Sequence, residues 1–140
     1  MSDRFFLDTN IFIYEVNSRG PSKKIVAARL VDDALDSGKG IVSFQVVQEF
    51  FSVAFRRFTP PMSPVEAEQA LAVTFRPLLA IHSSNSLYSQ ALQLTHRYSV
   101  SWYDSLIVAA ALEANCRILY TEDLQHGQQF SNLRVVNPFL

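Results

Sequence analysis

Cysteine is nearly absent from this sequence: among 140 residues there is one, Cys116. A single cysteine can form no internal disulfide bond, and it cannot build a zinc cluster of several thiolates. It lies between a helix-like and a strand-like segment, and free cysteine behaves as a small buried hydrophobic residue. We therefore expect Cys116 to be part of the core.

An excess of basic residues is also missing. The chain has 12 Lys and Arg against 13 Asp and Glu, which gives a formal net charge of −1. A broad nucleic-acid-binding surface needs many cations to displace the counterions of the phosphate backbone. The composition argues against such a surface and leaves only a small, local nucleic-acid site.

No apolar run reaches the about 20 residues that a membrane-spanning helix requires. An apolar stretch begins at Leu106 but is interrupted by Glu113 and Asn115. Strand-like residues begin at about Arg4, which leaves no room for a signal peptide before them. We expect no membrane partner, a cytoplasmic location, and one globular domain over residues 1–140.

Short apolar segments alternate with longer helical patterns, which is typical of an α/β domain with a central, mainly parallel sheet. The expected strands are residues 4–8, 40–43, 78–81, 117–121 and 133–136. The expected helices are residues 23–37, ended by Gly38, then 45–58, 63–76, a helix capped by Ser84 or Asn85, and one from near Ser101. The third helix begins with a capping sequence, Ser63-Pro64-Val65-Glu66, and we expect Pro77 to end it.

Four acidic residues lie where apolar segments begin or end: Asp8 in FFLDTN, Glu49 in VVQEFF, Asp104 in WYDSLIVAAAL and Asp123 in LYTEDLQHG. A buried carboxylate is costly unless something pairs with it, so this set predicts a shared cation. In a parallel sheet, sites form beyond the carboxyl ends of the strands, where Asp8 and Asp123 are expected. Asp104 in the first turn of its helix and Glu49 in the first half of another could reach the same edge.

The chemistry of these ligands indicates a hard divalent ion. Oxygen ligands suit Mg²⁺ or Mn²⁺, and Mg²⁺ keeps several waters beside a few carboxylates and a substrate phosphate. One such ion can activate water, and two can clamp both the attacking and the leaving oxygen of a phosphodiester. The polar neighbours expected to orient the carboxylates or a metal-bound water are Thr9, Asn10, Ser105 and Thr121.

Other roles for the acidic residues have less support in the sequence. Zinc is poorly supported, because His82, His96 and His126 are scattered and there is no CxxC or HExxH. Taken singly, Asp8 could be a turn residue, Asp104 a helix N-terminal charge and Asp123 a loop residue. The remaining acids are expected on solvated faces or helix ends, with Glu122 a weak candidate that points away from the site: Glu15, Asp32, Asp33, Asp36, Glu66, Glu68, Glu113.

Taken together, these motifs resemble the PIN-domain ribonucleases, and most closely the VapC-type toxins of bacterial toxin–antitoxin pairs. The resemblance extends over nearly the full length of the chain, in the order and spacing of that family. Asp8, Glu49 and Asp104 match its three most constant acids, Asp123 matches the more variable fourth, and Asn10 and Thr121 match its polar supports. His126-Gly127 departs from the pattern, since many members carry an aromatic residue there.

The resemblance implies a three-layer α/β/α sandwich and cleavage of RNA that depends on one or two Mg²⁺ or Mn²⁺ ions. It also implies a homodimer and a cognate antitoxin protein whose tail occupies the substrate groove. From the residues themselves, Arg56, Arg57, Lys23 and Lys24 could contact phosphate, or lie on a solvated face. Phe50, Phe51, Phe55 and Phe58 could pack in the core or against a partner, and Trp102 or Tyr103 could stack on a base, with one of the two expected in the core.

Two other functions compete with the nuclease. An aspartyl-phosphate phosphatase also begins with a strand that ends in aspartate, but it needs a second aspartate two residues later, where this chain has Asn10. A non-catalytic RNA-binding or protein-interaction module of the same fold could keep the acids as a structural metal site. Replacing Asp8 or Asp104 by Asn separates the enzyme from the module, because only an enzyme loses turnover.

Overall fold

The sheet of this computed structural model, which describes residues 3–18 and 20–140, has six strands in the order β3-β2-β1-β4-β6-β5. The strands are β1 Phe5–Leu7, β2 Gly40–Ser43, β3 Leu79–Ile81, β4 Ile118–Tyr120, β5 Gln129–Phe130 and β6 Leu133–Val136. All neighbours pair in parallel except β5, which is antiparallel to β6. The expected mainly parallel sheet is confirmed, and β1 lies in its interior between β2 and β4.

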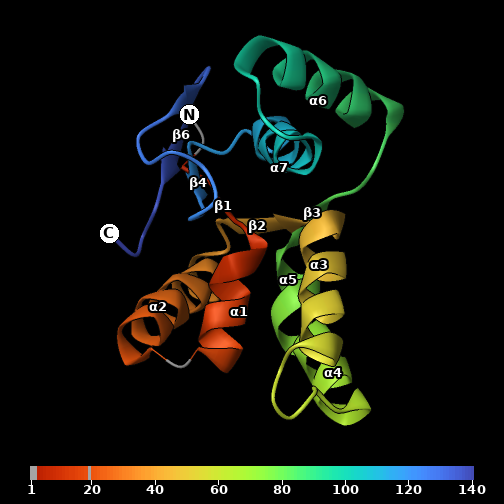
Figure 1. Cartoon of the computed structure of the whole chain (residues 1–140), viewed down its shortest axis with the longest axis vertical. Coiled ribbons are helices and arrows are strands. Elements are labelled where there is room, and N and C mark those ends of the chain that lie inside the picture. Colours follow the sequence, from red (N-terminus) through yellow and green to blue (C-terminus); the bar gives the residue numbers. More distant parts are fainter. Residues whose placement is uncertain (1–2, 19) are drawn as a thin grey trace.

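Helices cover both faces of this sheet (Figure 1). On one face lie α1 Thr9–Asn17, α2 Pro21–Ser37, α3 Phe44–Arg56, α4 Pro64–Ala70 and α5 Arg76–Leu78, with the wide π-helical turn η1 Leu71–Phe75 between the last two. On the other face lie α6 Asn85–Tyr98 and α7 Trp102–Glu113. The three layers of the expected α/β/α sandwich are therefore present. No helix in the described part of the chain is both long enough and apolar enough to cross a bilayer.

Serine residues cap three of these helices, which begin where the sequence predicts. The Ser63 hydroxyl accepts a hydrogen bond from the Glu66 backbone N–H, and the Glu66 carboxylate accepts one from the Ser63 N–H, which completes a capping box. Ser84 caps α6 by accepting from Leu87 N–H at 3.0 Å. Ser101 caps α7 by accepting from Asp104 N–H at 3.3 Å. The last contact fixes Asp104 in the first turn of α7, as expected.

The prediction that Pro77 ends its helix is wrong by one residue, because α5 continues to Leu78. Before it, the π-helical turn widens the backbone, and the Arg76 N–H bonds to the Leu71 carbonyl five residues back. Pro77 then falls in the first turn of a new helical segment, where a missing N–H breaks no hydrogen bond.

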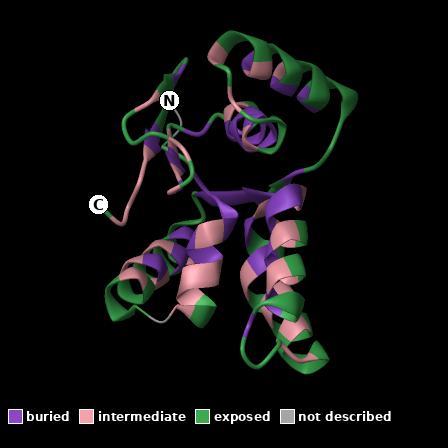
Figure 2. Cartoon of the chain, in the orientation of Figure 1, coloured by how far each residue is buried: buried purple, intermediate pink, exposed green. Residues whose placement is uncertain are grey.

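Helix α7 is the most deeply placed of the helices, and Figure 2 shows its middle turns in the colour of buried residues. Every residue from Ser105 to Ala111 is buried, because α7 lies between the sheet and α6. Cys116, just beyond this helix, is also buried, as the sequence predicts. Phe50 and Phe58 belong to the core, whereas Phe55 is half exposed and its ring stacks on Phe51.

Close packing at the amino end of β2 explains why residue 40 is glycine. A Cβ atom at Gly40 would lie 2.1 Å from the Ala34 Cβ and 2.6 Å from the Ala34 Cα on α2. Distances this short do not occur between real atoms, so α2 approaches β2 only because residue 40 has no side chain. Helix α2 itself ends at Gly38, whose φ of 70° is the left-handed conformation expected of a helix C-terminus.

Three features were absent from the sequence-based expectations. Helix α1 begins one residue after Asp8, within a segment where no helix was predicted, and β5 is a two-residue strand that exists only by pairing with β6. Glu15 was expected on a solvated face but is only partly exposed, beside a small cavity next to Phe50 and Phe75. Burial raises the pKa of Glu15 to about 7, and the nearby negative charge of Asp32 adds to this effect.

Candidate active site at the carboxyl ends of β1 and β4

Asp8 follows β1 directly and also caps α1. Its Oδ1 accepts a hydrogen bond from the Thr9 backbone N–H at 2.7 Å, and its Oδ2 accepts one from the Thr121 hydroxyl at 2.8 Å. The side chain is buried, with 5% of its surface exposed. Burial raises the pKa of Asp8 to about 7, against the effect of these two hydrogen bonds, and the negative charges of Asp123 and Glu49 raise it further.

Thr121 connects Asp8 to Asp123 across the gap between β1 and the end of β4. Besides donating to Asp8, its hydroxyl oxygen accepts from the Asp123 backbone N–H at 3.0 Å and from the Asn10 Nδ2 at 3.3 Å. The same Asn10 nitrogen donates to Asp123 Oδ2 at 3.2 Å. Partial burial raises the pKa of Asp123, and the charges of Asp104, Glu122 and Glu49 act in the same direction.

Glu49 reaches the same place from α3. Its Oε2 accepts a hydrogen bond from the Thr9 hydroxyl at 3.1 Å, and its Oε1 accepts one from the Gln45 Nε2 at 2.6 Å, one helical turn earlier. Gln45 is buried and also donates to the backbone carbonyl of Tyr103 at 3.2 Å. The structure thus identifies Gln45 as a support that the sequence reasoning missed, although a glutamine four residues before a site glutamate was a visible signal.

Asp104 approaches this network from α7 without a hydrogen bond to the other three acids among the described contacts. Its negative charge is close enough to raise the pKa of Asp123. Thr9, Asn10 and Thr121 therefore support the acids as predicted in position, and Ser105 does not. The Ser105 hydroxyl is fully buried and bonds to the Thr95 hydroxyl at 2.8 Å and to the Val100 carbonyl, so it joins α6 to α7.

Asp8 and Asp123 flank the point where the order of the strands reverses, since β2 follows β1 on one side and β4 lies on the other. In open α/β sheets this switch point opens a crevice beyond the carboxyl ends of the strands, because the connecting segments there diverge to opposite faces. The topology therefore brings the acids at residues 8, 49, 104 and 123 to the carboxyl ends of the parallel strands. We call this end of the sheet its carboxyl edge, and the opposite end its amino edge.

The donor set fits a hard divalent cation in composition. All four acids carry oxygen ligands, and the Asn10 Oδ1 is buried without a hydrogen-bond partner in the structure. Between residues 3–18 and 20–140, however, no three His, Cys, Asp or Glu side chains are grouped closely enough to enclose an ion directly. An ion that keeps part of its water shell, as Mg²⁺ does, suits this spacing better than one that demands a complete protein cage.

Lys23 and Glu122 form an ion pair beside the site at 3.1 Å. The Tyr14 hydroxyl donates to the same Glu122 carboxylate, and the Lys23 ammonium lies 4.4 Å from the centre of the Tyr14 ring. Glu122 thus points away from Asp123, as expected, and it fastens the segment after β4 to α1 and α2. Lys23 is engaged here, and Arg56 bonds to Ser52 on α3, so neither is a free phosphate contact in this structure.

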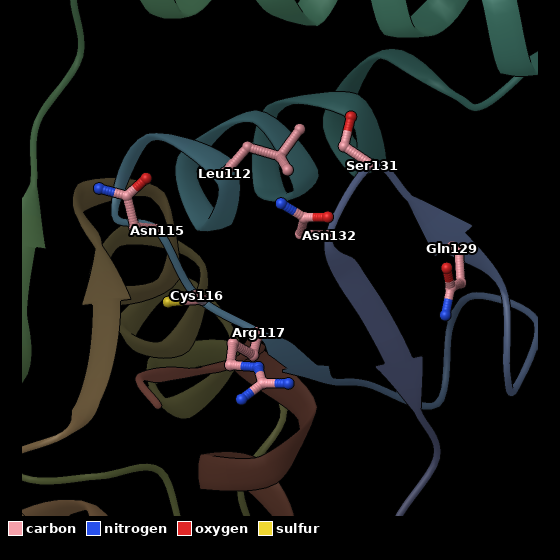
Figure 3. A pocket seen from close by; sticks show the side chains of 7 residues that line it. All are labelled: Leu112, Asn115, Cys116, Arg117, Gln129, Ser131 and Asn132. Atoms are coloured by element: carbon pink, nitrogen blue, oxygen red, sulfur yellow. The ribbon is translucent and has the colours of Figure 1, made fainter. Parts of the chain in front are cut away.

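A separate depression of about 670 Å³ lies at the amino ends of β4 and β6, whereas the acids lie at the carboxyl ends of the strands (Figure 3). Its side chains come from the end of α7, the start of β4 and the β5–β6 turn: Leu112, Asn115, Cys116, Arg117, Gln129, Ser131, Asn132. Except for Cys116 and Leu112, these residues are exposed, and burial raises the pKa of Cys116 to about 12, which keeps it a neutral thiol. This volume exceeds that of the grooves beside the acids, but it holds no group whose burial demands a ligand.

Comparison with known proteins agrees with this geometry. The structure is similar to that of VapC20 from Mycobacterium tuberculosis, described as a sarcin–ricin loop cleaving toxin, at 20% identity and a TM-score of 0.63, over 93% of this chain and 98% of that one. It is also similar to VapBC2 from Rickettsia felis bound to promoter DNA, at 18% identity and a TM-score of 0.66, over 94% and 96%.

A third similar structure is FitAcB from Neisseria gonorrhoeae, at 16% identity and a TM-score of 0.63, over 96% of this chain and 98% of that one. At identities this low, the structural likeness shows a shared fold and no more. No curated protein sequence matches this chain significantly. The model of the PIN domain family matches residues 5–129, which include all four acids, and this chain therefore belongs to the PIN domain family.

Proposed function

We propose that this chain is a metal-dependent endoribonuclease in which Asp8, Glu49, Asp104 and Asp123 hold one or two Mg²⁺ or Mn²⁺ ions. The observation that carries the proposal is the hydrogen-bond network that joins Asp8, Glu49 and Asp123 through Thr9, Asn10 and Thr121. Carboxylates held this close repel one another, which lowers the stability of the fold. A bound cation offsets this repulsion.

The residues of the chain would supply binding, orientation and charge. Each Asp8 oxygen accepts one hydrogen bond, and an ionised carboxylate has about four acceptor positions, so lone pairs are left for a cation. Thr9 and Gln45 hold the two oxygens of Glu49 in one orientation. A divalent ion held there would supply water of lowered pKa and positive charge for the phosphate, which are the needs of phosphodiester hydrolysis.

We further propose that the chain acts as the toxin of a toxin–antitoxin pair, as a homodimer whose whole 140-residue chain is one domain. The support is the likeness to VapC20, described as a sarcin–ricin loop cleaving toxin, to VapBC2 and to FitAcB. A cognate antitoxin would then have to cover the acidic edge, because that edge holds the groups that cut RNA.

The test is incubation of the purified protein with total cellular RNA in Mg²⁺, in Mn²⁺ and in EDTA, followed by sequencing of the new 5′ ends. We expect discrete cuts with either metal and none in EDTA. Asp8→Asn and Asp104→Asn should each reduce the cleavage rate by at least about 100-fold, as expected for groups that act on developing charge. Circular dichroism spectra and urea midpoints would show that both variants are folded.

Asp36→Asn is the matched control, because Asp36 is an exposed aspartate on α2 outside the acid network. It should cut like the wild type. If protein free of any inhibitor makes no cuts, or if cuts persist in both site variants, the nuclease assignment is wrong and a non-catalytic binding module of the same fold takes its place. Retained RNA binding without turnover in the wild type would identify that module.

A further inference from the structure

A second surface feature adjoins the acids: a groove of about 360 Å³ between the start of α3, α6 and the start of α7. Leu106 and Phe44 contribute apolar surface, and three aromatic residues, Tyr88, Trp102 and Tyr103, line it. The sequence analysis expected either Trp102 or Tyr103 in the core, and this is wrong. Trp102 is 37% exposed and Tyr103 is 68% exposed, because the first turn of α7 extends beyond the layer that buries the rest of the helix.

The aromatic side chains are accessible to solvent and are not part of a closed core. The rings of Tyr88 and Trp102 contact each other with their centres 6.3 Å apart and their planes inclined by 34°. The Tyr88 hydroxyl is held by the Ser83 hydroxyl at 3.0 Å, which ties α6 to the segment before it. Tyr and Trp rings exposed to solvent in this way are suited to stacking, because each presents a π-face at little conformational cost.

The groove adjoins the acid network through Gln45. Gln45 lines the groove, and its Nε2 donates both to Glu49 Oε1 at 2.6 Å and to the carbonyl of Tyr103 at 3.2 Å. Tyr103 is the neighbour of Asp104 in the chain. A molecule in the groove is therefore separated from the carboxylates by one side chain, and a polymer whose phosphate lies at the acids would place its next unit here.

We propose that this groove is a base-stacking subsite for one unpaired nucleobase of the RNA, next to the phosphate that the acids act on. The inference rests on the proposed function and adds to it the residues that select the base next to the cleaved phosphate. RNA-binding sites that use unpaired bases combine aromatic stacking with hydrogen bonds to the base edge.

The lining of the groove matches both parts of this requirement. The aromatic rings supply the stacking surface, and the exposed amide of Gln48 offers a donor and an acceptor to a base edge. No lining residue is charged, which suits a neutral base. The volume is at the lower end of the about 300–1,000 Å³ that small-molecule sites occupy, which suits one nucleoside rather than the face of a protein helix.

Trp102 makes the proposal directly measurable, since it is the chain's single tryptophan and its fluorescence reports this groove alone. The probe is a short oligoribonucleotide, titrated in Mg²⁺ into protein that carries Asp8→Asn so that the RNA stays uncut, beside the same oligomer with one abasic position in turn. We expect the oligomer to quench Trp102 fluorescence, and one abasic position to abolish the quenching while the sugar–phosphate chain still binds.

Tyr103→Ala should weaken the binding of the probe by about 5- to 100-fold, the range expected for loss of one stacked base, whereas Tyr103→Phe should bind like the wild type. Phe55→Ala is the matched control, because Phe55 is a similarly exposed aromatic residue at the far end of α3. Cleavage of total RNA by Tyr103→Ala should also lose its preference for the base at the subsite.

The outcomes separate this inference from the nuclease assignment. Metal-dependent cleavage without quenching, or with equal quenching by every abasic oligomer, would overturn the subsite and leave the nuclease intact. Quenching that requires one base in a protein that cuts no RNA would keep the subsite and overturn the nuclease. If Tyr103→Ala loses affinity for a protein partner and none for the oligomer, the groove is a protein-docking surface and the inference is wrong.

Discussion

The two edges of the sheet differ in what burial achieves. At the amino edge, α2 packs on Gly40 so closely that no side chain fits between them, and the nearby depression of about 670 Å³ is lined mostly by exposed residues. At the carboxyl edge, Asp8 is 5% exposed and two more acids share its hydrogen-bond network. The large hollow thus lies at the edge lined by exposed residues, whereas the candidate site is recognised by one buried carboxylate, Asp8, and by the acids that share its hydrogen-bond network.

This contrast predicts that substitutions at the amino edge change stability, and that substitutions at the carboxyl edge change activity and can even stabilise the fold. Natural proteins commonly show this opposition, because groups arranged for function are not arranged for stability. The following changes test it, beginning with the largest effect.

Gly40→Ala should be the most damaging single change to stability. The new methyl group would overlap the Ala34 side chain and backbone, and overpacking of this kind lowers the free energy of unfolding by about 3 kcal/mol. Urea unfolding measures it. Gly20→Ala is the matched control, because its new Cβ would meet only the Ser18 Oγ at 3.8 Å, and it should change stability by less than about 0.5 kcal/mol. Equal effects would refute the account of the close approach.

Thr121→Val should affect the carboxyl edge with almost no change of shape. It removes the hydroxyl that serves Asp8, Asn10 and Asp123 and leaves buried polar groups unpaired, so cleavage should fall about 10- to 100-fold, as for loss of a residue that orients metal ligands. Thr95→Val is the control, since it removes a hydroxyl bonded to Ser105 and Ala91 between α6 and α7.

Both variants should lose a similar part of their stability, about 1–3 kcal/mol, for the unpaired groups. Only Thr121→Val should lose most of its activity. If Thr95→Val is equally inactive, the polar network at the carboxyl edge is not what positions the acids.

Asp8→Asn should raise stability in the absence of metal. The pKa of Asp8 is raised from 3.8 to about 7, so the folded state favours the neutral acid. The stabilisation of the folded state by protonated Asp8 is fully present below pH 3.8 and is lost as the pH rises through about 7. In EDTA at pH 8 the variant should therefore be more stable than the wild type by about 1 kcal/mol, since one pKa unit corresponds to about 1.4 kcal/mol and the lost hydrogen bonds offset part of the gain.

Glu15→Gln sharpens the same comparison outside the site. Its pKa is also raised to about 7 by burial, so the substitution should likewise reduce the fall in stability between pH 5 and pH 8. Glu15 has no contact with the acid network among the described hydrogen bonds, and cleavage should be unchanged.

A lower melting temperature for Asp8→Asn at both pH values would show that the Asp8 charge is not destabilising in the metal-free fold.

Much of the fold followed from local patterns. Residues 133–136 and 40–43 were predicted as strands with the observed bounds, the Ser63 cap of α4 was identified, and the starts of α6 and α7 were placed near Ser84 and Ser101. Such features depend on neighbours along the chain. Helix α1 was missed because Asp8 caps a helix, whereas the sequence analysis considered it only as a candidate site carboxylate or a turn residue.

The remaining features depend on contacts between distant elements. Burial of Glu15 arises from α3 and the π-helical turn, and the engagement of Lys23 by Glu122 from residues 99 positions away. Ser105 follows Asp104 in the chain but points to α6, because successive positions on a helix face different directions. The four acids and the neighbours that bond to them, Thr9, Asn10 and Thr121, could be named from sequence. The support from Gln45 and the different role of Ser105 could not.

The interior position of β1 sets the time at which the acidic edge can be completed during protein synthesis. Asp8 is among the first residues to leave the ribosome, yet its Oδ2 is held by Thr121, which is 113 residues later. At about 5–20 residues per second, roughly 6 to 23 s of translation separate the two. A nascent or prematurely terminated chain that ends before β4 therefore lacks Thr121 and Asp123 and has an unfilled position beside β1. The group of acids joined through Thr121 is therefore complete only when synthesis is nearly finished.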